Sequence, residues 1–402
     1  MAGGDAVSVE YLDPEGRRAC RGLWEEAFPE DSVRYNDWYF QTKVAKNRIL
    51  AAVRENKHGD ATSDGGATSD GGAVMGSGKA NVTFGDMHSD GKTARPSPSA
   101  HDILSMAHMN PYTMVVGDRE VDSFYIVGVA TREKLRHRGL MKRLLQRMFA
   151  DLYSERMPFV FLMPVDPKIY EPFSFAYFCD HVPMRLRPDV SVVAHKVAFD
   201  LDLLAAWINE TISEKYQVYA RRDKAYLELY FEELAYENGT VTYYCSGPTQ
   251  PRPMVAIEAY WGKDQETLRS FLVRGDIYEV AGDPKPAYMA RIIHLPKMLS
   301  CLHLKDSCEK DGLTATICVE DPWIAENNGA FAWRLGKTGS EVRRIGDAGQ
   351  ALPEDVLCIS IPDLTQWVFG YRPLDELAVV KPLPDWTQDV RVLRGVFLDE
   401  VV

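Results

Sequence analysis

The sequence lacks several features that mark particular classes of protein. It contains seven cysteines, which are scattered and form no Cys-x-x-Cys pair, so a reducing compartment fits better than a disulfide framework. No apolar run approaches the roughly 18 residues of a membrane-spanning helix, and the first residues show no charged-then-apolar signal pattern. These absences predict a cytoplasmic protein without a membrane span.

Basic residues and metal-ligand patterns are also scarce. There are 46 Lys and Arg against 58 Asp and Glu, which gives a net charge of −12. Nucleic acid as a partner usually requires a basic face, so we expect none. The charge would suit a cationic amine, although many soluble proteins are simply acidic. The spacing of Cys301, His303 and Cys308 matches no standard zinc site, so we also expect no metal.

Composition divides the chain into three parts. With 402 residues, of which 46% are hydrophobic, it has room for two or three domains. Residues 57–101 are rich in Gly, Ser, Asp and Thr and repeat the six residues 61–66 directly in 67–72. Such a segment buries too little apolar surface to order itself, so it predicts a flexible insertion. We place three domains at 1–182, 183–288 and 289–402.

The most informative stretch runs from residue 124 to residue 177. The apolar run Phe124–Thr131 predicts a strand, and an amphipathic helix is predicted from Leu140 to about Tyr153. A second apolar run, Phe159–Met163, predicts a further strand. With shorter antiparallel strands predicted at 49–53, 103–108 and 114–116, and a turn at 109–111, this indicates an α+β fold with a mixed sheet.

A basic turn stands between the first strand and the helix. Arg136, His137 and Arg138 precede Gly139, which opens the helix. Free N–H groups at a helix start favour an anion, and a glycine lets a diphosphate approach the main chain. The turn matches neither the P-loop nor the dinucleotide fingerprint. An ordinary basic surface turn would have the same composition. Gly128, inside the strand, predicts a bulge or a close backbone approach.

Aromatic residues cluster before residue 41. Tyr35, Trp38, Tyr39 and Phe40 would either pack in the core or form an aromatic wall of a substrate pocket. Acidic residues near such a wall could hold an amine. We take Phe28, Asp31, Trp38 and Glu400 as candidate substrate-binding residues, although Asp399 and Glu400 could equally belong to a solvated tail.

Taken together, these motifs are similar to those of a known enzyme family. Arg-x-x-Gly opening a helix after an apolar strand resembles the acetyl-CoA motif of the GNAT acetyltransferases. The stretches 125–131, 136–141, 161–164 and 169–175 resemble the Eis (enhanced intracellular survival) family more narrowly. Residues 219–226 resemble its second, GNAT-like domain. Residues 289–292, 327–329, 369–372 and 397–402 resemble its sterol-carrier-like third domain. Only the insertion at 57–101 lies outside the resemblance.

The resemblance implies two tandem GNAT-type domains, a sterol-carrier-like third domain and roles for named residues. Tyr170 would be the general acid and the α-carboxylate of Val402 the base. The family also implies oligomers. His137 stands where an Arg is common, and Met141 replaces a usually smaller residue. The residues implied to bind acetyl-CoA are Val129, Ala130, Thr131, Arg136, His137, Arg138, Gly139, Leu140, Met141, Lys142, Val165 and Asp166.

The chemistry of amine acetylation needs such an acid and base. A lysine-like amine, with a pKa of about 10.4, must lose a proton before it attacks, and the leaving thiolate needs a proton donor. Tyr170 could instead be an aromatic packing partner, and Val402 could end a merely docked tail in which Phe397 and Val401 are buried. We therefore predict an N-acetyltransferase acting on a primary amine of a small molecule or lysine side chain, by direct attack in a ternary complex. The alternative is a non-catalytic protein that binds an apolar ligand or regulates through its GNAT core.

Overall fold

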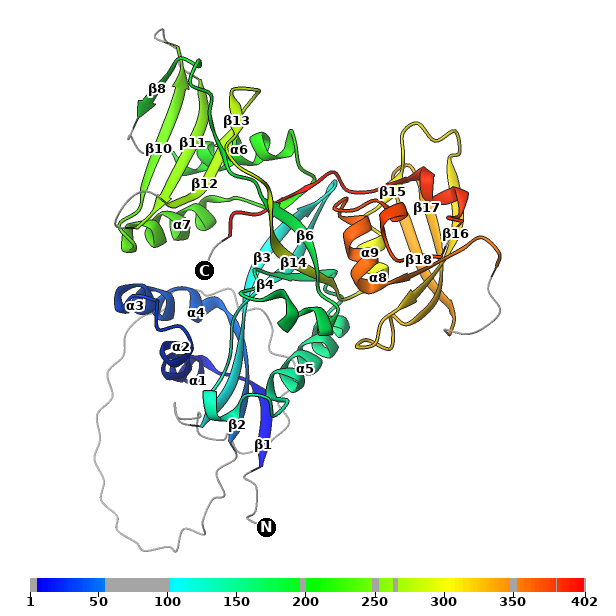
Figure 1. Ribbon diagram of the computed structural model, residues 1–402, viewed down its shortest axis with the longest axis horizontal. Coiled ribbons are helices and arrows are strands. Elements are labelled where there is room, and N and C mark those ends of the chain that lie inside the picture. The colour runs from blue at the N-terminus through cyan, green and yellow to red at the C-terminus, as the bar shows by residue number, and fades with distance from the viewer. Residues whose placement is uncertain are drawn as a thin grey trace, which may run out of the picture.

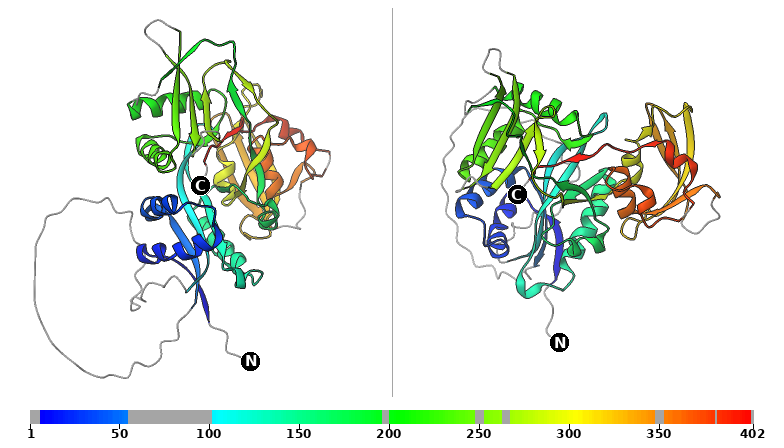
Figure 2. Two further views of the ribbon diagram at one scale, coloured as in Figure 1. Left: turned by 60° about the vertical axis from the view of Figure 1, so that its left-hand side comes forward. Right: turned by 45° about the horizontal axis from the view of Figure 1, so that its top comes forward.

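The structure forms three lobes around a central junction (Figure 1). It is a computed structural model that describes residues 6–54, 102–195, 200–247, 253–262, 267–347, 353–380 and 382–400. The predicted insertion at 57–101, Val401 and Val402 lie outside the described residues. The final described segment returns from the third lobe to the junction between the first two (Figures 1 and 2). None of the described helices combines the length and apolar character that crossing a membrane requires.

The first lobe is built on a mixed sheet of nine strands in which β1, β2, β3, β4, β5, β14 and β6 follow one another. β9 pairs with the far end of β3, and β21 pairs with β9. Neighbours on the main path are antiparallel except β4 and β5, which are parallel. The strands are β1 (Val7–Tyr11), β2 (Arg48–Arg54), β3 (Ile103–Val116), β4 (Arg119–Thr131), β5 (Phe159–Leu162), β6 (Ala176–His181), β9 (Val218–Ala220), β14 (Lys285–Ile292) and β21 (Val396–Phe397).

Helices cover both faces of this sheet because its buried strands are apolar on both sides. Side chains alternate along a strand, so in β4 Phe124 and Ile126 pack on one face while Tyr125 and Val127 pack on the other. The long helix α5 covers the first face, and four short helices cover the second (Figure 1). These helices are α1 (Pro14–Ala19), α2 (Arg21–Ala27), α3 (Val33–Gln41), α4 (Lys43–Lys46) and α5 (Leu140–Ser154).

β3 differs from the sequence prediction. A turn was expected at 109–111, but β3 runs without interruption from Ile103 to Val116. Pro111 is tolerated because pairing with β2 ends at Met109 and pairing with β9 begins at Met114. Among the described strands nothing pairs with that edge in between, so the missing N–H of proline breaks no ladder. The same gap in strand pairing helps to form the cavity described below.

The second lobe contains a four-stranded antiparallel sheet with two helices. The sheet has the order β12, β11, β10, β8, and a separate pair joins β7 to β13. The predicted helices at 200–212 and 223–236 are present as α6 (Leu201–Ser213) and α7 (Lys224–Tyr236). The strands are β7 (Met184–Leu186), β8 (Val192–His195), β10 (Thr240–Ser246), β11 (Met254–Trp261), β12 (Thr267–Val273) and β13 (Tyr278–Val280).

The third lobe packs a four-stranded sheet against short helices. Its order is β18, β17, β16, β19, with β16 and β19 parallel. The elements are α8 (Leu295–Leu299), β15 (His303–Leu304), β16 (Gly312–Glu320), β17 (Gly329–Gly336), β18 (Ser340–Gly346), β19 (Val356–Ser360), α9 (Ile361–Val368) and β20 (Val390–Arg391). Single 3-10 turns complete the chain at η1 (Glu133–Leu135), η2 (Pro167–Ile169), η3 (Glu171–Phe173), η4 (Leu374–Glu376) and η5 (Asp385–Asp389).

One strand crosses the expected boundary between the second and third parts. The boundary expected after residue 288 falls inside β14, which inserts between β5 and β6 of the first sheet. Its apolar residues are buried in the first lobe, so residues 285–292 belong structurally to the first sheet. The chain thus returns to the first lobe before it builds the third.

Candidate active site

The parallel strands β4 and β5 diverge at the centre of the first sheet. They pair only at Phe124 with Val160 and at Tyr125 with Phe161. β4 then continues to Thr131, while β5 ends at Leu162. The outer backbone edge of β4 is therefore left without a described strand partner beyond this point. An extended chain of amides, such as a pantetheine arm, could pair with that edge.

A bulge interrupts β4 where the strands diverge. Ala130 pairs with Met106, but Val127 pairs with His108, so β4 holds one extra residue. Gly128 has φ +56° there, and a Cβ at this position would lie 2.3 Å from the ring of Trp24. The bulge expected from the glycine is therefore present, and pairing with β3 resumes after it at Ala130 and Thr131. Val129 and Thr131 are half-buried and Ala130 is buried.

The basic turn leads into a helix start with no side-chain cap. His137 and Gly139 both have positive φ, at +61° and +77°. Gly139 occupies the N-cap of α5, and no side chain accepts a hydrogen bond from its first turn. Residues 136–139 are exposed. Open N–H groups next to exposed basic side chains form a site suited to a diphosphate.

The other expected cofactor residues surround this turn in different ways. The side chain of Leu140 is buried and that of Met141 is half-buried against the same core, so each can offer a ligand its main chain. The Lys142 ammonium lies 5.4 Å from the centre of the Trp323 ring of the third lobe. Val165 is 96% exposed, and Asp166 caps η2 by accepting a hydrogen bond from the Lys168 N–H at 3.0 Å.

Tyr170 follows β5, between the 3-10 turns η2 and η3. Its ring packs against Phe175 with centroids 5.9 Å apart, and its side chain is half-buried. Burial raises its pKa to about 12, so the phenol keeps its proton at neutral pH. Tyr170 therefore packs as an aromatic partner and also carries a protonated hydroxyl suited to an acid.

The candidate substrate residues separate into three places. The Trp24 indole donates a hydrogen bond to Asp31 at 2.8 Å and packs on Phe28 at 4.9 Å between ring centroids. Burial raises the pKa of Asp31. Trp38 is fully buried between aromatic neighbours and does not line the cavity, which fits the core interpretation of that cluster.

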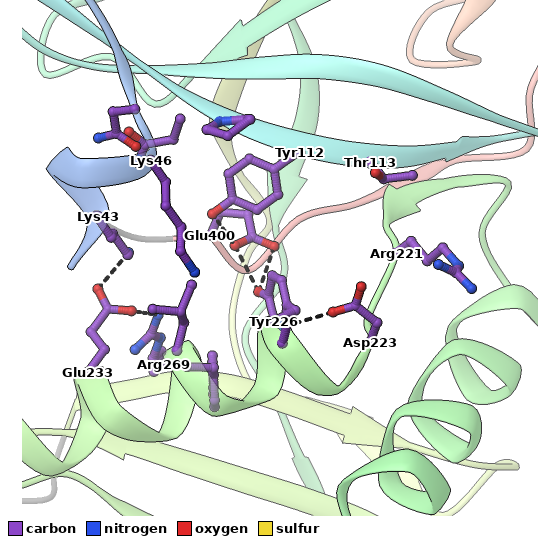
Figure 3. A pocket seen from close by; sticks show the side chains of 16 residues that line it. Lys43, Lys46, Tyr112, Thr113, Arg221, Asp223, Tyr226, Glu233, Arg269 and Glu400 are labelled. Carbon is purple, nitrogen blue, oxygen red and sulfur yellow. Dashed lines mark hydrogen bonds and ion pairs between the residues drawn. The ribbon is translucent and has the colours of Figure 1, made fainter. Parts of the chain in front are cut away.

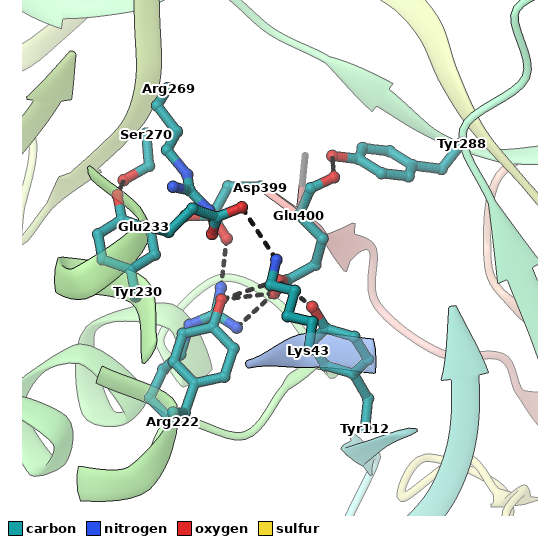
Figure 4. Close-up of polar contacts among 11 residues, drawn as sticks. Lys43, Tyr112, Arg222, Tyr230, Glu233, Arg269, Ser270, Tyr288, Asp399 and Glu400 are labelled. Carbon is teal, nitrogen blue, oxygen red and sulfur yellow. Dashed lines mark hydrogen bonds and ion pairs between the residues drawn. The ribbon is translucent and has the colours of Figure 1, made fainter. Parts of the chain in front are cut away.

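Glu400 lies instead at the centre of a buried polar cluster (Figure 4). Its carboxylate accepts hydrogen bonds from Arg222 at 2.6 Å and from the hydroxyls of Tyr112 and Tyr226. Tyr288 donates to its carbonyl oxygen at 2.7 Å, and Arg222 also pairs with Asp399. Burial acts to raise the pKa of Glu400, but the charge of Arg222 and these hydrogen bonds outweigh it and hold the pKa below its usual value.

The last described segment is thus docked rather than solvated. Val396 and Leu398 are buried, while Phe397 is half-buried against Tyr216 with ring centroids 5.4 Å apart. The expected burial of Phe397 is therefore partial, and the expectation for Val401 lies outside the described residues. The structure brings residues 396–400 to the junction of the first two lobes.

A cavity of about 230 Å³ opens beside Glu400 (Figure 3). It lies between α4, the unpaired stretch of β3, α7 and the end of the chain. The side chains that define its polar character are Lys43, Lys46, Tyr112, Asp223, Tyr226, Glu233, Arg269 and Glu400.

Sequence reasoning missed several of these residues. Tyr112 directly follows the turn expected at 109–111, and Arg222 was identified only as part of a family-like stretch. Nothing local marks Arg269, which lies in β12. Among the described residues no group of three His, Cys, Asp or Glu side chains could hold a metal ion.

Comparisons with known proteins agree with this architecture. The chain matches the family described as Acetyltransferase (GNAT) domain over residues 99–178 and the Sterol carrier protein domain over residues 304–400. No curated protein matches the sequence.

Solved structures match over nearly the whole chain. Eis1 from Mycobacterium abscessus has a TM-score of 0.63 at 13% identity, covering 99% of this chain and 100% of that one. A GCN5-related N-acetyltransferase from Kribbella flavida has a TM-score of 0.65 at 11% identity, with 99% and 98% covered. A protein of unknown function from Enterococcus faecalis, described as a probable N-acyltransferase, has a TM-score of 0.67 at 12% identity, with 97% and 94% covered.

At these identities the structural likeness concerns the fold, which agrees with the resemblance seen in the sequence. The chain therefore contains a match to the GNAT acetyltransferase domain family and a match to the sterol carrier protein domain family, in a fold similar to that of Eis1 from Mycobacterium abscessus.

Proposed function

We propose that the protein transfers an acetyl group from acetyl-CoA to a primary amine within a ternary complex. The observation that carries this proposal is the uncapped, basic start of α5, which follows β4, together with the divergence of β4 from β5. Such a start can hold the diphosphate of acetyl-CoA, and the open edge of β4 can hold its amide arm. The match to the GNAT acetyltransferase domain family supports the same reaction class.

In this proposal the residues of the turn bind rather than react. Arg136 and Arg138 supply positive charge, and the N–H groups of residues 139–142 face the phosphates. The main chain of Val129–Thr131 aligns the arm, so that the thioester lies near the bulge. Bringing thioester and amine together in one orientation supplies a large part of the rate enhancement.

Proton transfer is assigned to Tyr170 and Val402. The amine nitrogen attacks the acetyl carbon, the C–N bond forms and the C–S bond breaks. The proton lost by the amine passes to the α-carboxylate of Val402, and the departing thiolate takes the Tyr170 proton. The assignment of Val402 rests on the family resemblance and is supported by the docking of Glu400, two residues earlier, against the cavity.

Two experiments test the proposal. CoA release should be measured with the full chain, acetyl-CoA and a panel of primary amines, together with acetyl-CoA binding by calorimetry. Turnover of at least one amine is expected. The absence of both turnover and acetyl-CoA binding would overturn the proposed function. Adding residues after Val402 should abolish turnover while acetyl-CoA still binds, and full activity of the extended chain would remove Val402 from the mechanism.

A further inference from the structure

We propose that the acetyl acceptor carries a carboxylate as well as its amine, and that Lys46 and Arg269 bind this carboxylate in the cavity beside Glu400. The inference rests on the proposed function and names its substrate class. It follows from which charged groups around the cavity already have partners and which do not.

Arg269 is the strongest sign of a missing anion. It is only 5% exposed, yet its Nε and Nη1 atoms have no hydrogen-bond partner among the described residues. Its Nη2 donates to Glu233 at 2.7 Å. The guanidinium carbon lies 4.3 Å from the Tyr230 ring centre and 4.1 Å from that of Trp261, so the group is held in one plane. Buried N–H groups without acceptors are costly, and a carboxylate would satisfy them.

Lys46 supplies a second cationic side chain with free donors at the same cavity. Its side chain points from α4 in among the lining residues (Figure 3). Lys46 is solvent-exposed, and no described residue forms an ion pair with it. Its neighbour Lys43 is already engaged, because its ammonium contacts Glu233 at 2.9 Å and lies 5.1 Å from the Trp38 ring centre. An anion entering the cavity therefore meets one free ammonium group and one buried guanidinium with free donors.

The acidic groups of the cavity are, by contrast, already compensated. Glu400 is held by Arg222 and two tyrosines, and Glu233 by Lys43 and Arg269. Asp223 accepts a hydrogen bond from the Tyr226 N–H and caps α7. Three of the four cationic lining side chains also have partners, because Arg221 pairs with Glu120, which does not line the cavity, and Lys43 and Arg269 share Glu233. Lys46 and the two unpartnered donors of Arg269 therefore remain for an anionic group of the acceptor.

The best test uses pairs of amines that differ only in the carboxylate. CoA release by the full chain should be compared for 5-aminopentanoate with pentylamine, and for L-lysine with L-lysinamide and cadaverine. The carboxylate-bearing member should have a KM roughly tenfold to a hundredfold lower, as expected for losing a charge-assisted hydrogen bond. Equal or better turnover of the members without a carboxylate would overturn the inference and leave the proposed function intact.

Single substitutions test which residues bind the carboxylate of the acceptor. Lys46→Gln should raise KM for the carboxylate-bearing amines about tenfold and leave kcat and the KM of the other amines unchanged. Lys224→Gln removes the same charge from an exposed residue that does not line the cavity, and should change nothing. Arg269→Lys keeps the charge but supplies fewer fixed donors, so it should raise KM for the same amines.

Other outcomes identify a different occupant or role. Arg269 also lines a second cavity of about 220 Å³ across residues 395–399, so an effect of Arg269→Lys without one of Lys46→Gln would overturn the inference. If Lys46→Gln lowers kcat equally for all amines, the two cations serve the chain's own terminal carboxylate instead. Absence of acetyl-CoA binding and of any turnover would overturn the proposed function itself.

Discussion

The first and second lobes both place helices against a sheet, but their helix starts differ in one respect that decides where a phosphate can bind. α5 begins at Gly139, which has no side chain to accept from its first N–H groups. α6 begins at Asp200, which accepts from the N–H groups of Asp202 and Leu203 at 3.0 and 3.1 Å. α7 begins at Asp223, which accepts from Tyr226 at 2.8 Å. A carboxylate already at a helix start both satisfies its donors and repels a phosphate.

The strand pairing of the two sheets also differs. The first contains the parallel pair β4 and β5, which diverge and leave an open backbone edge. The strand pairs described in the second sheet are all antiparallel. The first lobe therefore combines diverging parallel strands with an uncapped helix start, whereas the described part of the second lobe has capped helix starts and only antiparallel pairs. The comparison shows why a single acetyl-CoA site per chain is expected, and the following predictions test it.

The largest effect is expected from removing Tyr170, the proposed proton donor. Tyr170→Phe should lower kcat by roughly a hundredfold or more, the usual contribution of a general acid, and leave the KM for acetyl-CoA nearly unchanged. The matched control is Tyr177→Phe, a half-buried tyrosine in β6. Steady-state kinetics of CoA release measure both, and equal kcat values for the two variants would exclude Tyr170 as the acid.

The next effect comes from giving α5 the kind of cap that α6 and α7 have. Gly139→Asp should weaken acetyl-CoA binding roughly tenfold to a hundredfold, because its carboxylate would occupy the open N–H groups and repel the diphosphate. A Cβ at this position meets nothing within 4 Å, so steric conflict is not the cause.

Gly139→Asn is the control for charge, because asparagine tolerates positive φ better than most residues. It should weaken binding much less in the same calorimetric titration. If aspartate and asparagine behave alike, backbone conformation rather than charge controls the site.

The reverse change, made in the second lobe, should have a smaller effect. Asp200→Ala removes the cap of α6 and should lower the free energy of unfolding by about 1 kcal/mol. It should not create a second acetyl-CoA site, since the described strands of the second sheet include no diverging parallel pair. Denaturant unfolding measures the loss of stability, and calorimetry measures the number of acetyl-CoA molecules bound per chain. Binding of two acetyl-CoA molecules per chain would contradict the difference drawn between the two lobes.

The smallest expected effect concerns alkaline pH. Burial raises the pKa of Tyr170 from its usual 10.0 to about 12, so the folded protein favours the protonated phenol. That preference contributes stability below pH 10 and is lost only as the pH rises toward 12. Deprotonation of Tyr170 should therefore cause no fall in kcat between pH 8 and 10. An alkaline limb near pH 9 that disappears in Tyr170→Phe would contradict this placement.

The sequence by itself determined the cofactor-binding half of the candidate site. Strand, bulge, turn and helix lie between Phe124 and Ser154, and each depends on local signals: apolar periodicity, an internal glycine, and a glycine at the helix start. The helix expected from Leu140 to about Tyr153 ends in the structure at Ser154. Short-range patterns of this kind are fixed by backbone geometry within a few residues, so they are readable without knowledge of the fold.

Only the tertiary structure decided what surrounds the cavity beside Glu400. Glu400 meets Arg222 across 178 residues of sequence and Tyr112 across 288. No local pattern encodes such pairings, because they depend on how three lobes and the returning chain pack together. The insertion of β14 into the first sheet and the unpaired edge at Pro111 depend on the same packing. For that reason the sequence predicted the acetyl donor, whereas the acceptor class could be proposed only from the cationic donors around the cavity that have no described partner.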